Sequence, residues 1–137
     1  MPITPLKLFA WLLAWMALCL LPLCAVWLGD RPPPRGLLVE AGAMLGLLGL
    51  GMLAMQCVLT GRHRWFARGV GQDNLLQFHR RTGVAAWIIV LAHPVLLMAG
   101  DRAFLAWLDP TEDVLRAAGV WTLALATTTL IVSSLWR

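Results

Sequence analysis

Two histidines are the side chains of this sequence best suited to chemistry. Both belong to the third of its four apolar segments, at about residues 75–99. His79 stands at the start of that segment, and His93 lies well inside its apolar run. An ionisable side chain among so many apolar ones is costly to bury and is therefore a candidate for function. The remaining histidine, His63, lies in the charged stretch 61–65, and we expect it to be a solvated loop residue.

The spacing of His79 and His93 favours two separate haem ligands over one shared metal ion. The two residues are 14 positions apart, which in an α-helix is about 40° short of four turns and about 21 Å of rise. Both imidazoles then lie near one face, too far apart to bind a single zinc ion. A proton relay would need polar groups between them, which residues 84–92 do not supply.

Two haems, one near each leaflet, are compatible with this geometry, each bound axially by one histidine. Pro94 is expected to kink the helix beside His93, because it removes the amide that would bond to the carbonyl of Val90. The spacing also leaves open a structural role without a cofactor. In that case His79 is an interfacial residue and His93 bonds to a neighbouring helix.

The elements that position these histidines are four apolar helices. Hydrophobic residues make up 60% of the 137 residues and charged residues 13%, with a mean hydropathy of +0.76. This composition excludes a soluble enzyme and predicts one all-α domain, 1–137, a polytopic transmembrane helical bundle. Four spans are expected, at about 8–28, 37–60, 75–99 and 119–136, the first of them bent near Pro22.

The charges give the expected orientation. The net charge of +4 comes from cations in loops and at segment ends, without a basic face or motif for nucleic acid. Five arginines lie between the second and third segments, and with Lys7 and Arg137 they outnumber the four cations of the other two loops. The positive-inside rule then places both termini in the cytoplasm, and we expect a bacterial inner-membrane protein in contact with the lipid bilayer.

Small residues in the second segment are expected to form a close helix contact. Gly42, Ala43, Gly46 and Gly49 make a stripe that lets another helix approach. We interpret it as a contact inside the bundle rather than a dimer interface. The three cysteines lie in apolar runs at no metal-ligand spacing and are expected to be packing residues.

The third segment resembles a known family. The stretch from Asn74 through His79 to Gly83, followed by residues 87–97 with His93-Pro94, is similar to the third transmembrane helix of the ferric reductase-like transmembrane domain superfamily. That superfamily includes ferric reductases, NADPH oxidases and bacterial haem subunits of methionine sulfoxide reductase systems. The resemblance covers all four segments in order and hydropathy, and its motif lies in residues 75–97.

The resemblance implies a six-helix bundle that carries electrons across the membrane through two b-type haems. His79 matches the ligand of the inner haem and His93 that of the outer haem, with two further histidines on a fifth helix. Electrons would arrive from a cytoplasmic flavin reductase domain or subunit with FAD or FMN and NAD(P)H, and would leave to an acceptor at the outer face. Arg80, Arg81 and Arg102 are candidate partners for haem propionates. The positive-inside rule also explains the first two, and Arg102 could instead attract an anionic acceptor.

The sequence departs from this pattern after the fourth segment. A fifth helix, a sixth helix and a flavin- or nicotinamide-binding region do not follow, so we expect either a fragment of a longer protein or ligands supplied by another chain. Two alternatives are a single-haem member of the same superfamily and a non-catalytic membrane scaffold or assembly subunit with structural histidines. Haem absorbance separates the scaffold from the haem proteins, and haem-to-protein stoichiometry separates a single-haem protein from one with two haems.

Overall fold

The computed structural model describes residues 4–29, 33–60, 71–111 and 113–135. Its elements are α1 (Pro5–Leu28), α2 (Leu37–Thr60), α4 (Gln72–Gly100), the short 3₁₀ helix η1 (Arg102–Leu108) and α5 (Val114–Leu135). The four α-helices are long and apolar enough to cross a membrane. The expected all-α polytopic membrane bundle is thereby confirmed.

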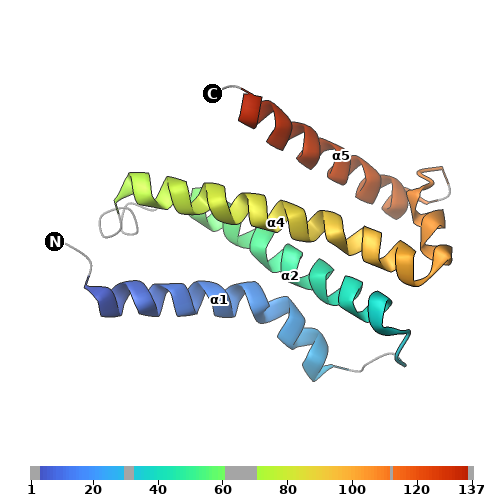
Figure 1. Ribbon diagram of the computed structural model, residues 1–137, viewed down its shortest axis with the longest axis horizontal. Coiled ribbons are helices and arrows are strands. Elements are labelled where there is room, and N and C mark those ends of the chain that lie inside the picture. The colour runs from blue at the N-terminus through green and yellow to red at the C-terminus, as the bar shows by residue number, and fades with distance from the viewer. Residues whose placement is uncertain (1–3, 30–32, 61–70, 112, 136–137) are drawn as a thin grey trace.

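The helices alternate in direction (Figure 1). The start of α1, the end of α2, the start of α4 and the end of α5 lie at one end of the bundle, and η1 lies at the other. Figure 1 also shows α1 changing direction in its second half, and the expected bend agrees with Pro22, which lies inside this helix. α4 continues through Pro94 as one helix, which keeps His79 and His93 on the same element.

The fourth span begins earlier than its hydropathy indicates, at Val114 instead of residue 119. Asp113 explains the difference, because its carboxylate accepts a hydrogen bond from the amide of Leu115 (3.3 Å) and its carbonyl accepts one from Ala117 (2.9 Å). A side-chain oxygen at this position satisfies an amide that the helix itself leaves unpaired. Arg116, one of the four cations counted in the other two loops, therefore belongs to α5.

The core lies among α1, α2 and α4. Trp15 and Cys19 of α1, Met52 and Met55 of α2 and Ala86 of α4 form a buried cluster. Phe78 of α4 packs edge-on against Trp15, with ring centroids 5.3 Å apart. Aromatic side chains thus form the contact between α1 and α4 in this cluster.

α2 and α4 approach most closely along the expected small-residue stripe. A side chain added at Gly42, Gly46 or Gly49 would meet α4 atoms, and one at Gly51 would meet the backbone of α1 at Cys19. The interpretation of the stripe as a contact within the bundle is confirmed. Because Gly46 faces His93, this contact also sets the surroundings of one candidate ligand.

α5 stands apart from the core. It contacts η1, and a hydrogen bond from the indole N–H of Trp87 to the hydroxyl of Thr127 (3.4 Å) joins it to α4. No residue of its apolar window is buried. Large apolar side chains exposed along all four spans match the hydrocarbon of a bilayer rather than water.

Candidate functional site

The space between α4, η1 and α5 is a cavity of about 670 Å³. That volume lies within the range of cofactor and small-molecule sites in proteins. Apolar side chains form most of its wall, and His93, Thr122 and Arg116 supply polar atoms. The remaining residues are Leu53, Trp87, Val90, Pro94, Leu97, Met98, Phe104, Trp107, Leu108, Leu115, Ala118, Gly119, Val120, Leu123 and Ala126.

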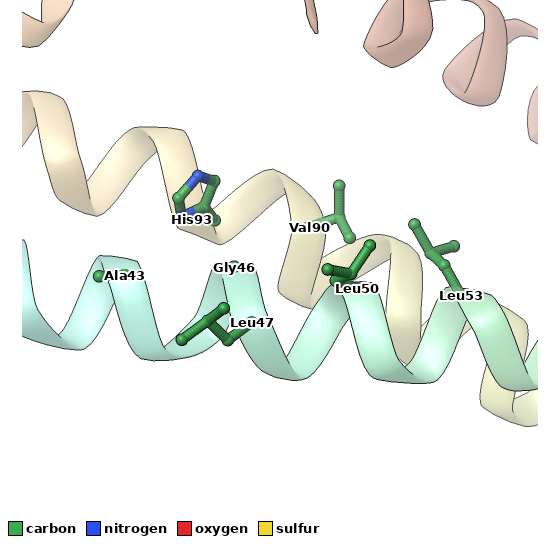
Figure 2. A pocket seen from close by; sticks show the side chains of 7 residues that line it. All are labelled: Ala43, Gly46, Leu47, Leu50, Leu53, Val90 and His93. Atoms are coloured by element: carbon green, nitrogen blue, oxygen red, sulfur yellow. The ribbon is translucent and has the colours of Figure 1, made fainter. Parts of the chain in front are cut away.

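A second, more open hollow of about 450 Å³ lies along α2 and α4 (Figure 2). Leu53, Val90 and His93 line both this groove and the cavity beside α5. His93 therefore stands where the two spaces meet. Figure 2 shows its ring over the turn of α2 that contains Gly46.

One ring nitrogen of His93 has a partner within the bundle. Its Nδ1 lies 2.7 Å from the backbone carbonyl oxygen of Gly42 on α2. A carbonyl oxygen only accepts, so in the neutral ring Nδ1 carries the proton and Nε2 keeps a lone pair. A histidine with this tautomer binds a metal through Nε2, which is the arrangement that a haem ligand requires.

His79 lies in a different environment nearer the start of α4. Its side chain is partly buried, and its Nδ1 is buried without a hydrogen-bond partner among the described residues. The neighbouring Thr82 donates to the carbonyl of Phe78 (2.8 Å) and receives a hydrogen bond from Gln56 Nε2 (3.0 Å). His79 lines neither of the two hollows. The structure thus does not bring the two histidines together.

The three arginines proposed from the sequence lie away from the cavity. Arg80 and Arg81 are exposed near the start of α4, and Arg102 is exposed at the start of η1. None of the three belongs to the cavity wall in the part of the chain that the structure describes. His63 lies outside the described residues.

Arg116 is the cation that sequence reasoning overlooked. Its guanidinium lies 5.5 Å from the ring centroid of Trp107, and its Nη1 donates to the carbonyl of Ala106 (3.4 Å). These contacts hold a positive charge at the cavity wall. The signal that could have found it is Asp113, an N-cap residue directly before Val114 that predicts a helix start there.

The loop beside Arg116 carries a stabilised carboxylate. The hydroxyl and the amide of Thr111 both donate to Asp109 (2.6 and 2.9 Å), and together with the charge of Arg116 they lower the pKa of that carboxyl below its ordinary value. Asp109 therefore stays ionised. Its negative charge partly offsets the field of Arg116 at this end of the molecule.

No three His, Cys, Asp or Glu side chains gather around one point among the residues that the structure describes. A metal ion held wholly by this chain's own side chains is therefore not indicated there. The expected haem ligands are not affected, because each iron would take a single histidine from α4.

A family model described as ferric reductase-like transmembrane component matches residues 45–137. The match includes all of α4 with both candidate histidines, the cavity-lining Arg116 and most of α2. No curated protein and no solved structure matches the chain significantly.

Proposed function

The chain belongs to the ferric reductase-like transmembrane components, and from this premise we propose that it is an electron-transfer module binding haem b through His93 between α4 and α5. The observation that carries the proposal is the hydrogen bond from His93 to the Gly42 carbonyl (2.7 Å) beside an apolar cavity. A fixed neutral imidazole in an apolar space is what an axial haem ligand needs.

The cavity's own residues match the two chemical parts of a haem. Apolar walls suit the macrocycle, and Arg116 is the one charged side chain among the described lining residues, where it would pair with propionate carboxylates. Bound haem would supply one-electron chemistry at its iron. The protein's part is to hold the ligand, exclude water and neutralise the carboxylates.

We assign a second haem to His79. The family match over the whole of α4 supports this proposal. Nδ1 of His79 is buried without a hydrogen-bond partner among the described residues, and a buried polar atom without such a bond costs free energy. A partner chain or missing segment that accepts a hydrogen bond from Nδ1 would remove that cost and leave Nε2 for a haem. Any further protein ligand to either haem would come from a fifth helix or from another chain.

The proposed direction of electron flow is from the cytoplasm outward. The arginines of segment 61–81 and the end of the bundle where α1 begins and α5 ends would lie on the cytoplasmic side. A flavin reductase domain or subunit with FAD or FMN and NAD(P)H would dock there. The haem that His79 would hold would then be the nearer of the two to this partner. Arg80 and Arg81 would face this partner, and Arg102 the outer acceptor.

The proposal is tested on the full-length protein purified in detergent after expression with ample porphyrin supply. We expect a Soret band and sharp bands on reduction, and two haems per chain. His93→Ala should remove the outer haem and keep the inner one, whereas His63→Ala, the same change at a histidine expected in a loop, should keep both. A colourless protein would support the scaffold alternative, and an unchanged His93→Ala spectrum would remove His93 from the site.

A further inference from the structure

We propose that Gly42 and Gly46 of α2 are positioning residues for His93. Gly42 fixes the tautomer of its imidazole, and Gly46 leaves room for the ring. The inference rests on the proposed function, since its consequence is that Nε2 of His93 is the nitrogen offered to a haem. It assigns a role to α2, an element that carries no candidate ligand of its own.

Gly42 acts through its backbone. In an α-helix the carbonyl of each residue accepts one hydrogen bond from the amide four positions later, and a carbonyl oxygen has a second lone pair to offer. His93 Nδ1 uses this second position, at 2.7 Å. The imidazole is thereby tied to the backbone of a helix, which cannot rotate away as a side-chain acceptor could.

Gly46 contributes because it has no side chain. A Cβ built at this position would lie 2.6 Å from His93 Nδ1 and 2.7 Å from Cε1, closer than real Cβ contacts come. An alanine would therefore displace the ring or separate the helices. Either movement lengthens the bond from Nδ1 to the Gly42 carbonyl, one turn away on the same face.

The hydrogen bond has an electronic consequence. A donor nitrogen bonded to a carbonyl gives the imidazole more negative character and makes its other nitrogen a stronger ligand. A stronger imidazole donor favours the ferric state, so the bond is expected to lower the reduction potential of the haem at His93. Loss of the bond should weaken haem binding and raise that potential.

Gly49 provides a matched control on the same helix. A Cβ there would lie 2.7 Å from Val90 Cγ2, an equally close contact with α4 that involves no imidazole. Gly49→Ala thus also forces α4 to give way at the contact between the two helices. Only Gly46→Ala places the new methyl group against His93.

The first experiment needs no substitution. Histidine-labelled protein without haem, in nanodiscs, is measured by ¹⁵N NMR, and the ring shifts of His93 are assigned by comparison with His93→Ala. We expect a neutral ring protonated at Nδ1. A neutral ring protonated at Nε2 would contradict the role of Gly42, whatever haem binding shows.

The second experiment compares haem affinity and reduction potential in the unsubstituted protein, Gly46→Ala and Gly49→Ala. Loss of a hydrogen bond behind a ligand costs about 10–100-fold in affinity, so we expect that loss and a raised outer-haem potential for Gly46→Ala alone. Equal effects of both substitutions, or none, would overturn the inference while leaving the proposed function standing. An unsubstituted protein without haem would instead overturn the proposed function, and the NMR result would still decide the tautomer.

Discussion

At the scale of single residues, burial and contacts show which arginine is the best candidate to bind a haem propionate. Position in the sequence alone could not rank them. Arg80, Arg81 and Arg102 are exposed, whereas Arg116 lines the cavity and is held by Trp107 and the Ala106 carbonyl. A guanidinium already held in place loses less side-chain freedom when it binds a carboxylate. Arg116 is for this reason the stronger candidate for a propionate partner.

Arg116→Gln is expected to weaken haem retention in the purified protein. A hydrogen bond to a charged group contributes about 1.5–3 kcal/mol, so the affinity for haem should fall by roughly tenfold or more. The measurement is competition for haem by apomyoglobin, followed by absorbance. Arg102→Gln, an identical change at an exposed site, serves as the control, and an equal loss in both variants would remove Arg116 from the binding site.

At the scale of the elements, α5 depends on its first turn more than the other spans do. It has little contact with the core, and Asp113 at its N-terminus bonds to the amide of Leu115. The same turn carries Arg116. The start of α5 therefore determines both the length of the span and the position of the cavity's cation.

Asp113→Ala should destabilise α5 by about 1 kcal/mol, the usual cost of removing a capping side chain. Amide hydrogen exchange of residues 114–120 in nanodiscs measures the effect, which we expect to be faster exchange in this turn with α1 and α2 unchanged. Asp113→Asn keeps a capping oxygen and should restore most of the protection. Unchanged exchange in Asp113→Ala would show that packing, rather than the cap, holds this turn.

At the scale of the whole molecule, the alternating helices place η1 and the start of α4 at opposite ends (Figure 1). Among the described residues, Arg80 and Arg81 lie near the start of α4, whereas Asp101 and Asp109 flank η1 at the other end. This asymmetry is the basis of the proposed orientation. In that orientation His79 and His93 would lie in different halves of the bilayer.

The orientation is tested with single cysteines in a background where Cys19, Cys24 and Cys57 are replaced by serine. A membrane-impermeant maleimide added to intact cells should label Asp109→Cys and should label Asp73→Cys only after the membrane is opened. Asp73 and Asp109 are both exposed, so access to the reagent decides the result. The reverse pattern would invert the topology and the direction of electron flow proposed above.

The sequence by itself determined the four spans and the placement of His79 and His93 on one helix, because lipid-matched length, hydropathy and helical periodicity are local properties. Whether His79 and His93 bind haem stays a prediction. The tertiary structure decided what each side chain meets. The Gly42 carbonyl behind His93, the space that Gly46 leaves for its ring and the position of Arg116 on the cavity wall all depend on how α2 and α5 are set against α4. Such a register is fixed by packing between distant segments, which a single sequence does not record.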